Sequence, residues 1–79
     1  MEKEYNIKIH NMAEITKIVN DCKKFSSDID AQYENRIVDA KSLIGMSLMI
    51  GYTIILRINS DDYNELVNFN LMCKNYKNI

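Results

Sequence analysis

The sequence contains few of the residues from which small catalytic and metal sites are built. Its 79 residues include one histidine, two cysteines, two glycines and no proline or tryptophan. Cys22 and Cys73 are too few and too far apart for a zinc motif. The sequence also shows no nucleophile triad, metal-ligand cluster or glycine-rich phosphate loop. It therefore argues against an enzyme and implies no cofactor.

Neither sign of charge dominates, and no apolar run is long. Ten basic residues against eleven acidic ones give a net charge of −1, so composition favours neither nucleic acid nor an anionic membrane as a partner. Charged residues 2–4 open the chain, unlike a signal peptide. Polar residues and a glycine interrupt the stretch 43–56, so no segment is expected to span a bilayer. We expect a cytoplasmic protein whose cysteines are reduced and buried.

The rest of the composition is that of a folded domain. Apolar residues make up 47% of the chain and charged residues 27%, which is typical of a globular protein and not of a disordered one. A chain of this length forms one domain at most. We therefore treat residues 1–79 as a single domain.

Alternating apolar and polar residues predict four strands, at residues 5–10, 28–33, 36–40 and 53–58. Glu34 and Asn35 form a two-residue hairpin connection, in which Asn35 tolerates a positive φ. In the first strand the alternation directs Ile7 and Ile9 to the core. It directs His10 to the exposed face of the sheet.

Helical spacing predicts two long helices and a short one between the third and fourth strands. Asn11 is the N-cap of the first helix, Glu14 can reach back as in a capping box, and the helix ends near Lys24. Its apolar stripe is Met12, Ile15, Val19 and Cys22. The last helix spans residues 63–76, and its inner face is Leu66, Phe69, Cys73 and Tyr76. Ser42 is the N-cap of the short helix.

The predicted order of elements is β-α-β-β-α-β-α. Both long helices can bury their apolar stripes against one face of an antiparallel sheet, which leaves the other face open. The sequence therefore predicts an α+β fold, an open-faced β-sandwich with a four-stranded antiparallel sheet and its helices on one face.

The central segment carries a resemblance to a known family. Lys-Ser-Leu-Ile-Gly at residues 41–45, followed by Met-Ser-Leu at residues 46–48, resembles the regulatory-serine segment of HPr. HPr is the histidine-containing phosphocarrier of the bacterial sugar phosphotransferase system. The resemblance is close from Lys23 to Leu48 and covers roughly the whole chain in element order. It implies an HPr-like bacterial protein with the same open-faced sandwich.

The sequence departs from the family at its phosphocarrier site. In HPr an Ile-His-Ala-Arg-Pro motif begins the first helix, where the helix dipole and free N–H groups stabilise the phosphoryl group. A gapless alignment places the family histidine at Asn11, its arginine at Ala13 and its proline at Glu14. Asparagine cannot form a phosphoramidate, and a carboxylate repels phosphate. Histidine phosphotransfer is therefore not expected, and His10 is the alternative phosphoacceptor if the site has shifted by one residue.

The regulatory-serine motif matches at Lys41, Ser42 and Gly45. In the family this serine is phosphorylated by a dedicated kinase, and the phosphoserine form binds a transcriptional regulator. The resemblance therefore implies phosphorylation of Ser42, which would add about −2 charge at the start of a short helix. The alternative is that Ser42 serves only as an N-cap.

The apolar residues around Ser42 predict a protein-docking surface. We expect Ile44, Met46 and Met49 to contact a partner together with Lys41; Leu43 and Leu48 are instead expected in the core. The resemblance implies phosphotransferase enzymes, HPr kinase or a transcriptional regulator as partners. The region 45–61 is a few residues shorter than in HPr, which alters this surface. Exposed apolar residues on so small a domain also predict a homodimer, formed by exchange of the first strand.

Three functions remain open on the sequence. The first is a regulatory or adaptor member of the HPr family, and the second is a phosphocarrier that uses His10. The third is a small binding module that shares only the fold, with a ligand on the open sheet face near Lys8, Arg57 and Tyr52. The third ranks last, because that face lacks the aromatic pairs that an RNA platform needs.

Overall fold

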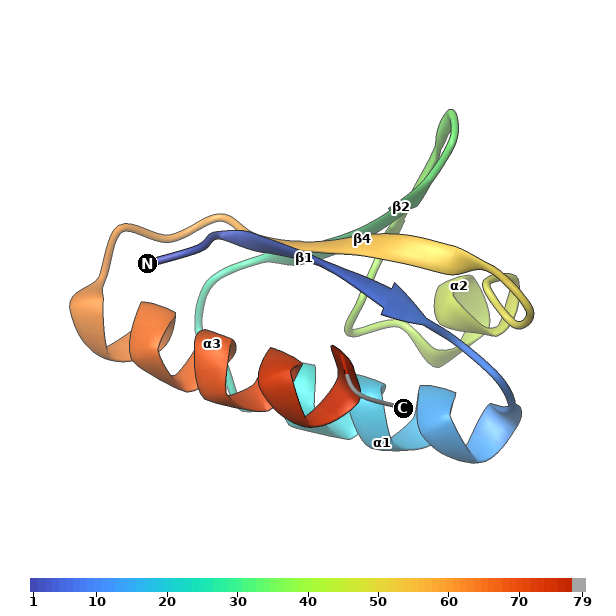
Figure 1. Cartoon of the computed structure of the whole chain (residues 1–79), viewed down its shortest axis with the longest axis horizontal. Helices are drawn as coiled ribbons and strands as arrows, with labels where there is room; N and C mark the ends of the chain where they lie inside the picture. Colours follow the sequence, from blue (N-terminus) through green and yellow to red (C-terminus); the bar gives the residue numbers. More distant parts are fainter. Residues whose placement is uncertain (78–79) are drawn as a thin grey trace.

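The computed structural model describes residues 1–77 and confirms the predicted order of elements (Figure 1). The strands are β1 (Glu4–Lys8), β2 (Ile29–Tyr33), β3 (Arg36–Asp39) and β4 (Thr53–Ile58). The helices are α1 (Met12–Cys22), α2 (Leu43–Ser47) and α3 (Tyr63–Lys77).

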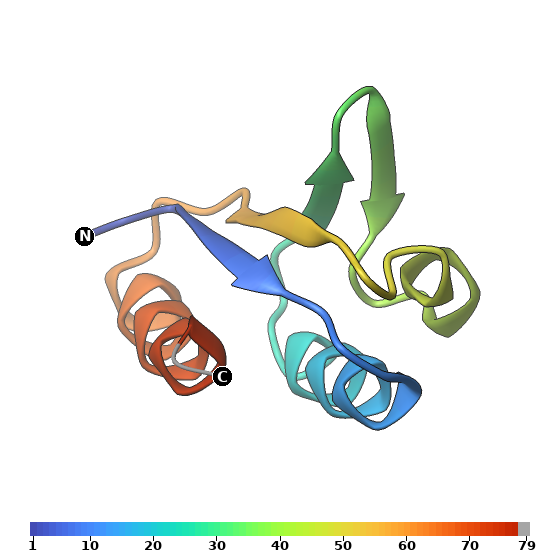
Figure 2. The ribbon, with the colours of Figure 1, turned by 45° about the vertical axis from the view of Figure 1, so that its right-hand side comes forward.

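The four strands form one antiparallel sheet in the order β1-β4-β2-β3. The strand β4 lies between β1 and β2, so that Ile54 pairs with Ile7 and Leu56 pairs with Ala31. The long helices α1 and α3 lie side by side on one face, and the other face is uncovered (Figures 1 and 2). The predicted open-faced sandwich is therefore confirmed.

The core fills the layer between the sheet and the two long helices. Alternate residues of β4 and the inner stripes of α1 and α3 are buried there. Phe69 lies at its centre and contacts the rings of Tyr5 and Phe25, with centroids 6.0 and 6.3 Å apart. Burying one such side chain stabilises the fold by roughly 2–3 kcal/mol. Both cysteines are buried as predicted, and burial raises the pKa of each thiol to about 12.

The first helix differs from its prediction at both ends. Met12, the first residue of the helix, is exposed, and Ile18 is buried in the stripe instead. The helix ends at Cys22 with Lys23 as its C-cap, before the expected Lys24. The rest of the predicted stripe, Ile15, Val19 and Cys22, is buried as expected.

The last helix buries more than its predicted stripe. Phe69, Cys73 and Tyr76 are buried as expected, whereas Leu66 is only half-buried. The sequence prediction missed buried Asn70, whose amide donates to the Glu2 and Leu66 carbonyls at 2.9 and 2.7 Å. The Tyr5 hydroxyl donates to the same side chain. Asn70 thus ties the start of the chain to α3.

The hairpin between β2 and β3 has the predicted two-residue connection, with one change. Glu34 carries the positive φ, at 53°, whereas the prediction had assigned that tolerance to Asn35. The backbone conformation at a turn is set by the strand register on both sides. None of the helices within residues 1–77 has both the length and the apolar character needed to cross a membrane.

Candidate functional site

The short helix α2 begins with a serine cap, as predicted. Ser42 has an extended backbone, and its Oγ accepts a hydrogen bond from the Gly45 N–H at 3.2 Å. Its own N–H donates to the Asp39 carbonyl at 2.9 Å. The side chain is half-buried, and the first turn of α2 contains no acidic residue. Ser42 is therefore both structural and partly accessible.

Gly45 allows α2 to approach the sheet closely. A Cβ atom at this position would lie 3.2 Å from the Cβ of Val38 and 3.5 Å from the Ser42 Oγ. These are tight contacts against β3 and against the cap itself. The glycine of the motif therefore holds the cap against the edge of the sheet.

The structure corrects the predicted orientation of the apolar residues on α2. Met46 and Met49 are fully buried and cannot contact a partner. Leu43 and Leu48 were expected in the core, but 43% and 56% of their surfaces are exposed; Ile44 is 84% exposed, as expected. Met46 and Met49 are three residues apart and take the inward positions, because α2 packs against α1 and β3. The exposed set, Leu43, Ile44 and Leu48, is called the α2 face below.

Lys41 forms two hydrogen bonds that stabilise the segment before α2. Its ammonium donates to the Phe25 carbonyl at 2.7 Å, and its N–H donates to the Asp39 carboxylate at 2.9 Å. The side chain is half-buried. Lys41 therefore holds the segment before α2 against the loop after α1 and is not a free cation for a partner.

The start of α1 has a second cap. The Asn11 Oδ1 accepts from the Glu14 N–H at 2.9 Å. The Glu14 carboxylate reaches back as predicted, but to the N–H of His10 at 2.8 Å. This bond is the main reason why the pKa of Glu14 is lower than usual. The start of α1 therefore already carries a carboxylate that is ionised at neutral pH.

His10 does not face the open side of the sheet, as the alternation had indicated. The strand β1 ends at Lys8, and Ile9 then bonds to the turn before β4, which directs the chain into α1. The His10 ring lies beside α1, with its Nδ1 3.0 Å from Oε1 and 3.2 Å from Oε2 of Glu14. The only histidine in the sequence is therefore at the helix start, paired with a carboxylate.

The two helix starts belong to one end of the molecule. The Ile9 N–H donates to the Tyr52 carbonyl at 3.0 Å, and the Gly51 N–H donates to the Ile9 carbonyl at 2.8 Å. The helices α1 and α2 also pack together, and Figure 2 shows both at the same end. The α2 face, Ser42 and the exposed Met12 thus lie on neighbouring elements.

On the open sheet face, the cations Arg57 and Lys8 are already bonded within the chain. The Arg57 guanidinium donates to the Glu4 carboxylate at 2.8 and 3.0 Å and to Gln32 at 3.3 Å. The Lys8 ammonium donates to the Gly51 carbonyl at 2.7 Å. These contacts leave Arg57 and Lys8 less available to a ligand than the third interpretation of the sequence requires.

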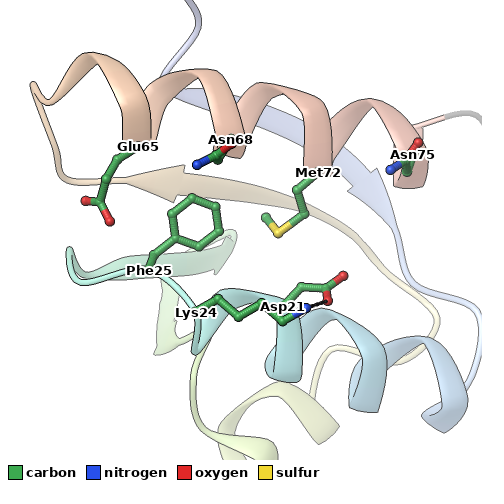
Figure 3. Close-up of a pocket in the computed structure, with 7 residues that line it drawn as sticks. All are labelled: Asp21, Lys24, Phe25, Glu65, Asn68, Met72 and Asn75. Atoms are coloured by element: carbon green, nitrogen blue, oxygen red, sulfur yellow. Dashed lines mark hydrogen bonds and ion pairs between the residues drawn. The ribbon is translucent and has the colours of Figure 1, made fainter.

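A cavity of ≈330 Å³ lies between α1 and α3 (Figure 3). Phe25 and Met72 line it, and its two carboxylates are already bonded within the chain. Asp21 accepts from the Tyr76 hydroxyl and lies 3.5 Å from the Lys24 ammonium. Glu65 accepts from the N–H and hydroxyl of Ser26 and from the Ser27 hydroxyl. These bonds join the helices and loops of the fold, so they are structural contacts.

No protein-family model matches the sequence, and no curated protein matches it. Solved structures do match. HPr-C-His from Thermoanaerobacter tengcongensis is 25% identical, with 95% of this chain and 91% of that chain covered and a TM-score of 0.74. The phosphocarrier protein HPr from Bacillus anthracis str. Ames is 14% identical, with 87% and 89% covered and a TM-score of 0.66.

The fold and these matches define the class of the chain, an open-faced α+β sandwich with the HPr arrangement of strands and helices. The chain is therefore HPr-like in its fold over nearly its whole length. By its name, the Bacillus anthracis protein is a phosphocarrier.

Proposed function

We propose that this HPr-like protein is a regulatory or adaptor member of the phosphoenolpyruvate-dependent sugar phosphotransferase system. It acts through contacts with other proteins and is phosphorylated on Ser42, not on histidine. The observation that carries the proposal is the α2 face, where exposed Ile44 lies beside the Ser42 cap. Exposed apolar side chains grouped on one element mark protein contacts.

The surroundings of Ser42 favour a phosphate there. The first turn of α2 has no carboxylate, and its N–H groups are directed toward the cap. A phosphoserine adds about −2 charge and three acceptor oxygens, which backbone N–H groups at a helix start can bind. Because Ser42 is adjacent to Leu43 and Ile44, the added charge would change the surface that a partner contacts.

The start of α1 is less suited to a phosphoryl group. Asn11 caps this helix, and its side-chain amide has no nucleophilic nitrogen comparable to imidazole. The Glu14 carboxylate lies against His10 Nδ1 and would repel a phosphoryl group on that nitrogen. These two contacts support a member of the family without the histidine step.

The proposal is tested by intact-mass spectrometry after incubation with HPr kinase and ATP. We expect one added phosphate, mapped to Ser42 and absent from Ser42→Ala. Ser47→Ala is the matched control, because Ser47 is the other serine of α2 and its hydroxyl donates to the Ile44 carbonyl. No phosphate, or a phosphate that Ser42→Ala retains, would contradict the proposal.

Docking by the α2 face is tested with charge substitutions. Ile44→Asp should lower the rate of phosphorylation by HPr kinase about tenfold or more, since it places a charge in the centre of a desolvated contact. Leu71→Asp is the control, because Leu71 is equally apolar and 58% exposed but lies on α3. Equal rates for the two variants would exclude the α2 face as the docking surface.

One observation favours a second candidate, a phosphocarrier that uses His10. The ring lies at the start of α1, and Glu14 contacts its Nδ1, which favours the tautomer with a basic Nε2. Incubation with phosphoenolpyruvate and the general phosphotransferase enzyme tests it. An acid-labile phosphate that is lost in His10→Gln would establish the carrier and reject the proposal of a chain without histidine transfer.

A further inference from the structure

A cavity of ≈400 Å³ lies between the β2–β3 turn and the end of α2. Its walls include two tyrosines, an arginine, an asparagine, a leucine and a glutamate: Tyr33, Tyr52, Arg36, Asn35, Leu48 and Glu34. Its volume is within the range of small-molecule sites. It is separate from the Ser42 cap at the other end of α2.

One wall is a fixed aromatic surface. The rings of Tyr33 and Tyr52 are stacked, with centroids 4.2 Å apart and planes 25° apart. Tyr33 also packs against the core, which holds the pair in place. Tyr52 remains 43% exposed although Tyr33 covers one side of its ring. Its remaining surface can therefore stack against a flat ligand.

The cavity also contains a cation with no partner. The Arg36 guanidinium forms no hydrogen bond or ion pair with any other residue in the range 1–77, and the same holds for the Asn35 side-chain amide. The other arginine, Arg57, is bound by Glu4 and Gln32. A free guanidinium can bind both oxygens of a carboxylate or phosphate at once.

The free guanidinium and the aromatic wall distinguish this hairpin cavity from the cavity between α1 and α3. In the latter cavity both carboxylates are already bonded within the chain, so a ligand would have to displace internal contacts. At the hairpin, a ligand gains an ion pair and a stacking contact without displacing any bond of Arg36. The unpaired cation and the aromatic wall together identify the hairpin cavity as the better binding site.

We propose that this cavity binds a small ligand made of a planar ring that carries an anionic group. The ring stacks on Tyr52 with its edge against Leu48, and the carboxylate or phosphate pairs with Arg36. The Glu34 carboxylate lines the same cavity and opposes the anion, so the affinity is modest. This site needs neither a protein partner nor phosphorylation of Ser42.

The test is a titration of the full chain, followed by ¹H–¹⁵N NMR at low salt. The probes are naphthalene-2-carboxylate, which carries a carboxylate directly on a planar ring, and, separately, adenosine monophosphate, in which a ribose joins the phosphate to a planar base. We expect saturable shifts confined to residues 33–36 and 48–52, with a Kd of about 1 mM or tighter for at least one probe. Binding of one probe alone identifies which anion the site takes.

Variants separate this site from general surface binding. Arg36→Gln should weaken binding about fivefold and Tyr52→Ala about tenfold. Lys74→Gln and Tyr63→Ala are the matched controls, since both residues are exposed on α3, and they should leave the affinity unchanged. Glu34→Gln should tighten binding about two- to fivefold, a gain that a folding defect cannot produce.

Three results would overturn the proposal. They are shifts spread over the whole surface, the same affinity in Arg36→Gln as in the native chain, or no saturation with either probe. Because the assay contains no kinase or partner protein, a failure here leaves the Ser42 proposal untouched. A failure of Ser42 phosphorylation likewise leaves this site untouched.

Discussion

Helices α1 and α2 begin with the same device but with different charges. The Asn11 Oδ1 accepts from the Glu14 N–H at 2.9 Å, and the Ser42 Oγ accepts from the Gly45 N–H at 3.2 Å. In each case the side-chain oxygen bonds an N–H three residues further on. The first turn of α1 contains a glutamate, whereas that of α2 has no acidic residue.

This difference decides where an anion can be added. The positive end of α1 already interacts with the Glu14 carboxylate, so a second anion there meets repulsion. The cap of α2 is the neutral oxygen of Ser42, its first turn has no carboxylate, and the Asp39 carboxylate that precedes it is bonded to the Lys41 N–H. We infer that two helix starts with similar backbones differ in function through one residue in the third helical position.

The two helices also differ in how they are held. The eleven residues of α1 bury Ile15, Ile18, Val19 and Cys22, whereas the five residues of α2 bury only Met46. A short element with few buried contacts opens at lower free energy than the rest of a domain. Within α2 itself, Met46 is therefore the buried side chain that holds the helix in place.

The largest expected effect comes from removing that methionine. Met46→Ala should lower the free energy of unfolding by about 2–4 kcal/mol, because it leaves a cavity beneath α2. Ile44→Ala on the exposed side should change it by less than about 0.5 kcal/mol. Urea denaturation followed by circular dichroism measures both. Similar losses in the two variants would show that α2 is not held by its buried side.

The caps come next. Asn11→Ala should cost about 1–2 kcal/mol and Ser42→Ala about 0.5–1 kcal/mol, since each leaves a backbone N–H without its acceptor. The larger value belongs to Asn11, because its loss also disturbs the Glu14 bond to His10. The same urea measurement applies, with Ser60→Ala as the control. Ser60 lies before α3, and within the described residues its hydroxyl bonds only the Asp62 N–H. A Ser42→Ala variant as stable as the native chain would mean that the cap contributes nothing.

Much of the fold could be predicted because its signals are local. Strand alternation, helical spacing and the two N-caps depend on neighbouring residues, and the structure confirms Asn11 and Ser42 as caps. The open-faced sandwich followed from where the apolar stripes had to be buried. The backbone conformation of the turn was predicted less well, since Glu34 takes the positive φ in place of Asn35.

The candidate site was predicted less well because it depends on contacts between distant segments. The rotation of α2 is set by Gly45 against Val38 and by packing on α1, and this decides that Met46 is buried and Leu43 exposed. His10 turns to α1 because Ile9 bonds the turn at Tyr52. Spacing along the chain carries no signal for such contacts.

The stacked tyrosines are a second contact between distant segments that the sequence did not predict. Tyr33 and Tyr52 are brought together because β2 and β4 pair in the sheet. The sequence prediction looked for aromatic pairs on the open face. The pair instead lies on the side where Tyr33 packs against the core.

The contribution of the Glu14 carboxylate to stability should depend on pH. The folded pKa of Glu14 is below its ordinary value of 4.5, so its stabilising contribution is fully present above pH 4.5 and is lost as pH falls through the lower folded value. Glu14→Gln should therefore be less stable than the native chain at pH 7, by less than about 1 kcal/mol. The gap should close below pH 4.5.

The measurement is the difference between the two unfolding curves at each pH, because other carboxyl groups, including those of Asp61 and Glu65, also have lowered pKa values. Glu2→Gln is the control, since the Glu2 carboxylate forms no hydrogen bond with any residue in the range 1–77. A gap that stays constant from pH 7 to pH 3 would show that Glu14 acts through packing and not through its charge.

The smallest expected effect comes from placing an aspartate at each of the two caps, which compares them directly. Aspartate is a good N-cap, so Ser42→Asp keeps the hydrogen bond and adds a negative charge to a helix whose first turn has none; it should stabilise the chain by about 0.3–0.5 kcal/mol. Asn11→Asp adds the same charge beside Glu14 and should give no gain. Both are measured by urea denaturation at low and high salt, and salt should remove the gain at Ser42. An equal gain at the two caps would show that Glu14 does not fill the start of α1, and the reason for placing the phosphate at α2 would be lost.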